Sequence, residues 1–286
     1  MTIEYIPGEM EVKRVYKSFG RGKEVLEDVN LKIEGGKLTV LCGPSGCGKT
    51  TLINLLAGYL PPDSGEILLD GQPLKGPEWD RLVVFQETAL FPWMNLWDNT
   101  MVGPICQGRD KKDAEEMAHY LIDKVGLRGF EKKFPYQLSG GMQRRAELIR
   151  ALINRPKVML MDEPFRGLDA MTRELMQEYF LNLYEETKMT VLFITAELEE
   201  AIYLGDIAYF MTVRPGTIKK RMEVNLPRPR TYRVLATPEY QELESIAIKV
   251  VDEEAVKAFQ ILRVKAGIEK ESKSETDNVK ERDTVG

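Results

Sequence analysis

The chain alternates between short apolar runs and longer segments whose apolar residues recur at helical spacing. Runs of strand length lie at 37–42, 65–69, 82–86, 158–161 and 190–194. Helical spacing is found at 49–60, 110–127 and 169–188, and in a segment that follows Ser139. Because strand, loop and helix follow one another in this order twice, the pattern predicts an α/β protein with a parallel sheet.

Changes in composition divide the chain into parts. The helical stretch between the third and fourth strands predicts a mostly helical insertion at about 88–150, within a main domain at 10–235. A proline-rich stretch at 226–229 marks a break after the core. A helical extension is expected at 236–268, and the charged stretch 269–286 is expected to be disordered because it contains almost no apolar residues.

A glycine-rich loop follows the first apolar strand and precedes a helix. It reads Gly43-Pro44-Ser45-Gly46-Cys47-Gly48-Lys49-Thr50 and fits the phosphate-loop pattern G-x-x-x-x-G-K-[ST]. Glycines allow successive N–H groups to point at phosphate oxygens, and the helix N-terminus adds a positive partial charge. We expect Lys49 to reach the β- and γ-phosphates of a nucleoside triphosphate, Thr50 to ligate Mg²⁺, and Thr51 to belong to the same site.

A second glycine-containing motif opens the helix that follows residue 138. Residues 137–143 read Gln-Leu-Ser-Gly-Gly-Met-Gln. Ser139 is a good N-cap, and Gly140 and Gly141 permit a ligand to approach the backbone closely. Taken alone, the motif is equally compatible with a capped helix start that has no ligand.

Two acids stand at the end of the strand predicted at 158–161. Open α/β sheets place their sites at the C-terminal ends of strands, where Asp162 and Glu163 lie. We expect Asp162 to hold the Mg²⁺ shell and Glu163 to polarise an attacking water as general base. The alternative is a strand that ends in a solvated acidic turn.

In this order, the three motifs resemble the nucleotide-binding subunit of an ABC transporter, over roughly residues 10–235. The resemblance implies a P-loop NTPase fold with a RecA-like parallel-sheet core, a small antiparallel β subdomain and a helical signature subdomain. It also implies a head-to-tail dimer that sandwiches two ATP. In that dimer Ser139, Gly140 and Gly141 of one subunit contact the γ-phosphate held by the other subunit's phosphate loop.

The same resemblance assigns further residues. Gln86 matches the family's Q-loop glutamine and is expected to act in catalysis by sensing Mg²⁺ and the attacking water. The segment 167–169 matches the D-loop. Phe19 matches the aromatic residue that stacks on adenine, although Tyr16 lies nearby and a core aromatic is the usual alternative.

Three segments are similar to a narrower group, the ATPases of nitrate, sulfonate and taurine importers. They are 85–93, 213–216 and 224–230. This similarity implies an ATP-hydrolysing motor subunit that energises uptake of a small anion-type solute. Its partners would be transmembrane permease subunits, a second ABC ATPase subunit (an identical chain or a paralogue) and, indirectly, a periplasmic or extracellular solute-binding protein. Trp93 and its neighbours would line the groove that receives a coupling helix of the permease, with a buried Phe-Pro-Trp corner as the alternative.

Charge and hydropathy restrict the location of the protein. The formal net charge is -5, without the basic excess that nucleic-acid binders usually show, so no nucleic-acid partner is expected. No apolar run approaches the roughly 18–20 residues that a membrane-spanning helix needs, and the N-terminal residues lack a signal-peptide pattern. Three cysteines without zinc-site spacing favour a reducing compartment. We therefore expect a peripheral protein on the cytoplasmic face of the cell membrane.

One position departs from the family pattern. Where the family usually has Thr-His-Asp after the strand at 190–194, this chain has Thr195, Ala196 and Glu197. Alanine cannot hydrogen-bond a γ-phosphate. Three explanations are open: a naturally slow or differently wired site, a degenerate member that pairs with a complete paralogue, and an engineered substitution. An ATP-binding regulatory subunit with little hydrolysis is the corresponding alternative function.

Overall fold

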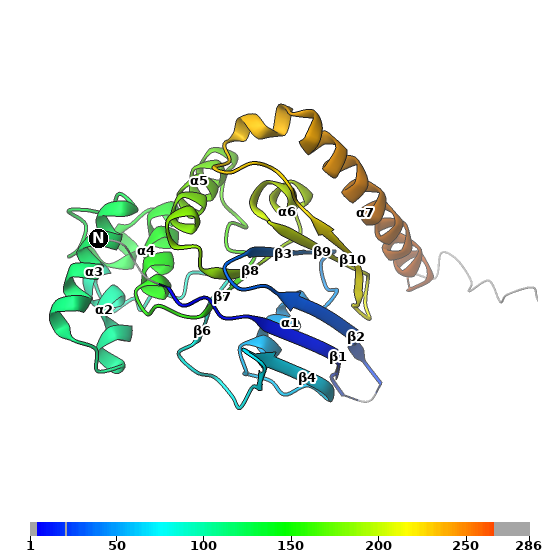
Figure 1. Cartoon of the computed structure of the whole chain (residues 1–286), viewed down its shortest axis with the longest axis horizontal. Helices are drawn as coiled ribbons and strands as arrows, with labels where there is room; N and C mark the ends of the chain where they lie inside the picture. Colours follow the sequence, from blue (N-terminus) through cyan, green and yellow to red (C-terminus); the bar gives the residue numbers. More distant parts are fainter. Residues whose placement is uncertain (1–4, 21, 266–286) are drawn as a thin grey trace, which may run out of the picture.

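The computed structural model describes residues 5–20 and 22–265. These residues form two sheets flanked by helices (Figure 1). The charged tail expected at 269–286 lies outside the described residues, as do the last residues of the extension expected at 236–268.

The larger sheet has six strands in the order β10-β9-β3-β8-β7-β6. The strands are β3 (Leu38–Cys42), β6 (Arg81–Val84), β7 (Val158–Asp162), β8 (Thr190–Thr195), β9 (Ile207–Met211) and β10 (Ile218–Glu223). All neighbours pair in parallel except β9 and β10, which are antiparallel. The α/β class and the parallel sheet predicted from the pattern are therefore confirmed.

Both faces of the parallel sheet are buried, which explains why its strands read as continuous apolar runs. On β7, Met159 and Met161 belong to the hydrophobic cluster on one face, and Val158 and Leu160 belong to the cluster on the other. Because successive side chains point to opposite faces of a strand, a helix or a second sheet must cover each side.

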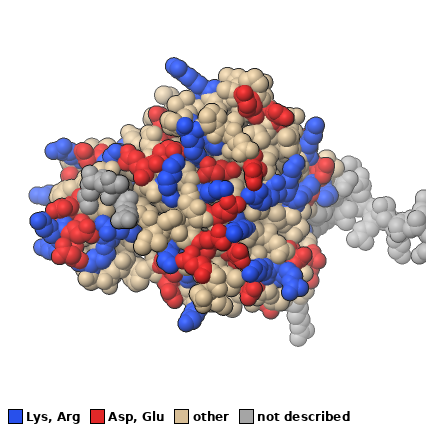
Figure 2. All heavy atoms as spheres, in the orientation of Figure 1, with Lys and Arg blue, Asp and Glu red and all other residues tan. Residues whose placement is uncertain are grey.

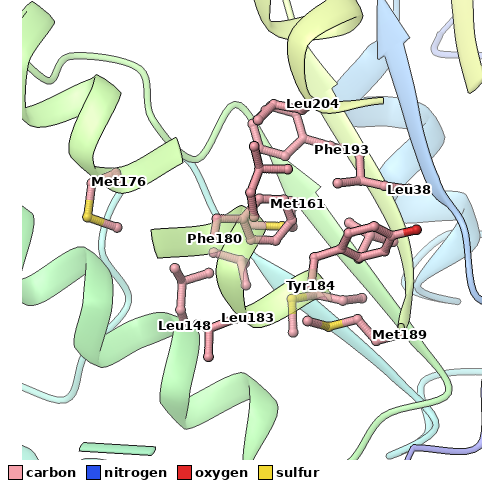
Figure 3. Packing of buried hydrophobic residues seen from close by; sticks show 14 of the residues in the cluster. Leu38, Leu148, Met161, Met176, Phe180, Leu183, Tyr184, Met189, Phe193 and Leu204 are labelled. Carbon is pink, nitrogen blue, oxygen red and sulfur yellow. The ribbon is translucent and has the colours of Figure 1, made fainter. Parts of the chain in front are cut away.

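The first face is covered by α5 (Ala170–Thr187), α6 (Leu198–Leu204) and α7 (Pro238–Lys265). Figure 3 shows Phe180 and Tyr184 of α5 beside Met161 and Phe193 of the sheet. The rings of Phe180 and Phe193 lie 5.8 Å apart. The helix α7 runs along the outer edge of this layer, far from the helices at the opposite end of the molecule (Figure 1).

The second face is covered by α1 (Lys49–Leu56) and by the antiparallel sheet β2-β1-β4-β5. The bounds of these strands are β1 (Met10–Ser18), β2 (Glu24–Ile33), β4 (Ser64–Leu69) and β5 (Gln72–Pro73). The prediction that α1 continues to residue 60 was wrong. The helix ends at Leu56 because Gly58, with φ of +78°, turns the chain into a left-handed conformation.

Three helices form a group at one end of the molecule, on the left of Figure 1. They are α2 (Leu96–Cys106), α3 (Lys111–Lys124) and α4 (Gly140–Leu152). The side chain of Ser139 caps α4 by accepting a hydrogen bond from the N–H of Met142 at 3.3 Å. Within the described part of the chain, no helix is both long enough and apolar enough to cross a bilayer. Acidic and basic side chains are interspersed over the face shown in Figure 2.

Candidate active site

The phosphate loop connects β3 to α1, as its sequence predicts. Its glycine at position 48 has φ of +111°, and a Cβ there would lie 2.6 Å from Cδ2 of Leu26. A residue with a side chain would therefore be strained there and would collide with β2. Lys49 is only 5% exposed, and its ammonium donates to the carbonyl oxygens of Gly43 at 2.7 Å and Pro44 at 3.1 Å.

The two acids predicted after β7 have different surroundings. Asp162 is buried, and burial raises the pKa of its carboxyl, against the opposite effect of a hydrogen bond from Thr50. Glu163 has a backbone φ of +44°, an uncommon conformation for a residue with a side chain. Its N–H donates to the carbonyl oxygen of Ile194 at 2.9 Å, so a parallel neighbour fixes its position. Such local strain is common at functional sites.

The carboxylate of Glu163 lies between two cations. Its Oε1 is 3.4 Å from Nζ of Lys49, and its Oε2 accepts a hydrogen bond from Arg166 at 2.6 Å. The glutamate side chain is 11% exposed, whereas that of Arg166 is 55% exposed. The acid of one motif and the lysine of another, more than a hundred positions apart in the sequence, thus meet at one point.

A cavity of about 470 Å³ lies over the phosphate loop. Its lining includes the sequence-predicted residues Phe19, Ser45, Gly46, Gly48, Lys49, Thr50, Thr51, Gln86 and Glu163. Four further lining residues were missed in the sequence analysis: Lys23, Val25, Arg166 and Arg214. Phe19 is 44% exposed at this cavity, so it is not a core aromatic.

The remaining predicted residues of the loop and the acidic strand do not line the cavity. Gly43 and Pro44 contribute the carbonyl groups that bind Lys49. Cys47 is buried beneath the loop, with its sulfur 4.0 Å from that of Met211. Asp162 lies behind Thr50, to which it is hydrogen-bonded.

The signature residues are not brought to this cavity within one chain. Ser139, Gly140 and Gly141 are absent from its lining. A Cβ at Gly140 would meet no atom within 4 Å, and one at Gly141 would lie 3.1 Å from a methyl group of Thr172. The backbone at the start of α4 is therefore open to an outside group.

Gln86 lies two residues beyond the end of β6, not at the end of a strand that spans 82–86 as its sequence predicts. The segment that carries it is held by a buried ion pair on α4. Arg144 donates to the carbonyl oxygen of Phe85 at 2.7 Å and to that of Gln86, and it pairs with Glu147 at 2.6 Å. Glu147 in turn accepts the N–H of Ala89 at 3.0 Å. The helix α4, which begins at the signature motif, thus fixes the position of the segment that carries Gln86, the Q-loop.

The departure at Ala196 lies at the carboxyl end of β8. Ala196 and Glu197 are exposed and do not line the cavity. The N–H of Glu197 donates to the hydroxyl of Thr195 at 2.9 Å, which turns the chain into α6. The side chain of Glu197 therefore takes no part in the cavity as it stands.

The oxygen atoms in this region suit a hard cation. Thr50 provides a hydroxyl, Gln86 an amide carbonyl and Asp162 a carboxylate, which are ligand types that Mg²⁺ prefers. Among residues 5–20 and 22–265, no cluster of three His, Cys, Asp or Glu side chains is placed to hold a metal ion. A metal site made of protein ligands alone is therefore not seen there, and the set of donors fits an ion bound together with a phosphate ligand.

A second, mostly apolar cavity of about 410 Å³ lies between α2, α4 and β6. Phe91 and Arg150 contribute to its lining. Trp93 stacks on Phe91 with ring centroids 5.3 Å apart, yet it is 69% exposed. The alternative of a buried Phe-Pro-Trp corner is therefore wrong, and Trp93 itself stands outside the lining.

The missed residues differ in whether the sequence could have revealed them. Arg166 follows the acidic strand directly, so its proximity to Glu163 could have been inferred from the local spacing. Arg214 lies far along the chain, and only the pairing of β9 with β3 brings its loop to the phosphate loop. Arg144 and Glu147 sit on a helix at positions that sequence alone reads as a solvated ion pair.

Comparisons with known proteins agree with this geometry. The family model described as "ABC transporter" matches residues 26–166. The uncharacterized ABC transporter ATP-binding protein MJ0412 of Methanocaldococcus jannaschii is 40% identical, over 86% of this chain and 91% of that protein. The taurine import ATP-binding protein TauB of Roseobacter denitrificans is 48% identical, over 71% of this chain and 75% of that protein.

A solved structure supports the same conclusion about the fold. It is the dimeric post-hydrolysis state of the ATP-binding cassette MJ0796 bound to ADP and Pi. It matches with a TM-score of 0.66 at 27% identity, and the match covers 76% of this chain and 100% of that chain. Together these similarities confirm the fold that the motifs implied.

Proposed function

This chain belongs to the ABC transporter family of ATP-binding proteins, and on that basis we propose that the cavity over its phosphate loop binds ATP and hydrolyses it to power an importer. The observation that carries the proposal is the meeting of Lys49, Gln86 and Glu163 around one cavity that also contains Phe19. The chain is the ATPase subunit, with the membrane-spanning part supplied by other chains.

Electrostatics suggests how the cavity responds to a nucleotide. Lys49 is bound to loop carbonyls and stands 3.4 Å from Glu163. A triphosphate brings several negative charges to the same place, so Lys49 turns toward the phosphate oxygens and Glu163 loses one cation. Arg166 keeps the carboxylate in position. Glu163 is then free to accept a proton from the attacking water as general base.

Magnesium fits the oxygen donors of the cavity. The residues that would hold it are Thr50 and Gln86, with Asp162 behind them in its shell. When bound, the ion neutralises charge on the β- and γ-phosphate oxygens. The protein's own contribution is to orient these donors, which Asp162 does through its hydrogen bond with Thr50.

The signature supports a dimer as the working unit. Because Ser139, Gly140 and Gly141 lie outside the cavity of their own chain, we infer that they act on the γ-phosphate bound by a second subunit. The open backbone at Gly140 leaves room for that approach. The structural neighbour MJ0796 is described as dimeric. The second subunit is either an identical chain or a paralogue.

The importer partners are transmembrane permease subunits, which attach the ATPase to the cytoplasmic face of the membrane. The apolar cavity between α2, α4 and β6 suits an inserted permease helix, and Trp93 stands exposed beside it. Similarity to the taurine import protein TauB supports a small anion-type solute, since taurine carries a sulfonate group. A periplasmic or extracellular binding protein would deliver it. The proposed organisation is an ABC domain at 10–235 with its helical part at about 88–150, followed by the extension at 236–268.

The experiment that tests the proposal separates binding from hydrolysis. Glu163→Gln keeps the shape of the side chain but removes the base, so phosphate release should fall by about 10²–10⁴-fold while ATP binding persists. Glu178→Gln, an exposed acid on α5, serves as the charge-matched control and should hydrolyse ATP normally. Undiminished phosphate release by Glu163→Gln, measured together with the permease, would rule out the assigned base.

A further inference from the structure

The inner face of α7 contains an acid where helical periodicity places an apolar residue. Tyr240, Ala247 and Val250 are buried at this face, and Glu254 continues the same stripe. Glu254 is only 2% exposed. Burying a carboxylate is costly unless it is paired and hydrogen-bonded, so its partners need an explanation.

Glu254 binds three donors, one of which is backbone. Its carboxylate accepts hydrogen bonds from Nζ of Lys219 and of Lys257, both at 2.8 Å, and from the N–H of Val213 at 3.0 Å. Burial alone would raise the pKa of Glu254, but these hydrogen bonds lower it to about 2. The carboxylate is therefore charged at neutral pH, and by accepting the N–H of Val213 it holds the first part of the loop between β9 and β10 against α7.

The far side of this loop touches the nucleotide cavity. Gly216 exchanges main-chain hydrogen bonds with β2, donating to Val25 at 2.8 Å and accepting from Glu27 at 3.1 Å. A Cβ on Gly216 would lie 2.1 Å from the carbonyl oxygen of Cys47, so the two backbones are in direct contact. One short loop thus connects the C-terminal helix to the phosphate loop.

Arg214 lies at the centre of this loop and lines the cavity. Its guanidinium donates to the carbonyl oxygens of Glu24 at 2.8 Å and Lys23 at 3.4 Å. The carbonyl of Lys23 also accepts the N–H of Phe19 at 3.1 Å, which places Arg214 at the Phe19 end. Among the described residues no carboxylate pairs with Arg214, so its charge is available to an anionic ligand.

We propose that Arg214 contacts the ribose–phosphate part of ATP at the Phe19 end of the cavity, and that Glu254 is a positioning residue for this contact through the backbone of Val213. The inference rests on the function proposed above and deepens it. Lys49 binds the phosphates from the phosphate loop, and Arg214 supplies a further cation of the same cavity, at its Phe19 end. A guanidinium suits this role because it can keep its main-chain bonds while its remaining N–H groups face phosphate oxygens.

The contact is tested by titrating the purified full chain with a fluorescent ATP analogue and Mg²⁺. Arg214→Ala should weaken binding by about tenfold, the effect expected from one charge-assisted hydrogen bond. Arg214→Lys should recover part of the affinity, and the difference from the unaltered chain should shrink at high salt. Because Arg214 is exposed, its replacement should leave the melting temperature unchanged. Equal affinities of the Ala variant and the unaltered chain would overturn the proposed contact.

The positioning role is tested with two neighbouring acids. Glu254→Gln should weaken binding severalfold, whereas Glu253→Gln should not, although Glu253 pairs with the same Lys219 at 2.6 Å. Glu253 is 67% exposed, and its side chain does not accept the N–H of Val213. The exposed acid is therefore a matched control for charge.

Repeating Glu254→Gln in the Arg214→Ala background distinguishes positioning from a general loss of structure. If Glu254 acts through Arg214, the second substitution causes no further loss of affinity there. An equal loss in both backgrounds would show a merely structural effect and overturn the positioning role. If the unaltered chain itself fails to bind the analogue, the proposed ATP site is refuted and not only the role of Arg214.

Discussion

The buried ion pair between Arg144 and Glu147 allows a sharp test of how the signature helix supports the Q-loop. The two side chains are 6% and 3% exposed and lie 2.6 Å apart. Arg144→Met keeps most of the volume but removes the charge and the hydrogen bonds to the carbonyl groups of Phe85 and Gln86. Glu147 then remains buried without its paired cation; the N–H of Ala89 still binds it, and Arg150 is the remaining cation that acts on its charge.

The expected loss of stability follows from that geometry. Breaking a buried pair by removing one partner costs about 3–5 kcal/mol. At about 2–4 °C per kcal/mol for a protein of this size class, the melting temperature should fall by roughly 10 °C at pH 8. Turnover should fall as well, because Gln86 loses the bond that fixes its backbone.

The pH dependence identifies the cause. Burial raises the pKa of Glu147, and Arg144 opposes that shift, so removing Arg144 raises the pKa further. When the pKa of an acid is higher in the folded than in the unfolded state, the acid stabilises the folded state at pH values below its unfolded pKa. This contribution to the free energy of unfolding is lost as the pH rises through the pKa of the folded state. The loss of stability caused by Arg144→Met should therefore be largest at pH 8 and become smaller toward pH 5.

Thermal unfolding followed by calorimetry at both pH values measures this effect. The double variant Arg144→Met/Glu147→Gln serves as control, because it removes the stranded charge and should regain about half of the loss or more at pH 8. A deficit that is equal at pH 5 and pH 8, and that the double variant does not relieve, would refute the argument from an uncompensated carboxylate.

Two further substitutions have defined outcomes. Ala196→His introduces a hydrogen-bond donor at the end of β8 and should raise ATP turnover by about 10²-fold in phosphate-release assays. Unchanged turnover would mean that the residue at this position does not limit the rate of hydrolysis. Arg230 is 5% exposed and donates to five carbonyl oxygens, including that of Gly205 at 2.7 Å. Arg230→Met should lower the free energy of unfolding by about 3 kcal/mol or more, because those acceptors lose their donor; a melting temperature within 2–3 °C of the unaltered chain would contradict this.

The motifs predicted most of the site because each is a continuous segment with a fixed backbone role. The strand β3 ends just before Gly43, and β7 ends at Asp162. Both strands pair with β8, so sheet topology alone brings the phosphate loop and the two acids together. The sequence could not show that Arg166 binds Glu163, since that contact depends on side-chain conformation.

The rest of the site depends on tertiary pairing that leaves little trace in local sequence. Glu254 interrupts an apolar stripe and therefore looks like a surface residue, yet it is buried because Lys219 of β10 faces it. The helix α6 and the strands β9 and β10 were not distinguished in advance, so the segment 213–216 was noted only for its similarity to importer ATPases and its place at the cavity was missed. Its place beside Phe19 follows only from the hydrogen bonds to residues 23 and 24.

The separation of the signature from the phosphate loop within one chain has a kinetic consequence. In the proposed dimer each reaction centre draws residues from two molecules, so the rate of the isolated subunit should depend on the square of its concentration when it is dilute. A permease that holds two copies side by side converts this second-order encounter into a first-order closure. In the proposed assembly the membrane partners therefore control the rate by bringing two copies together, without touching the nucleotide.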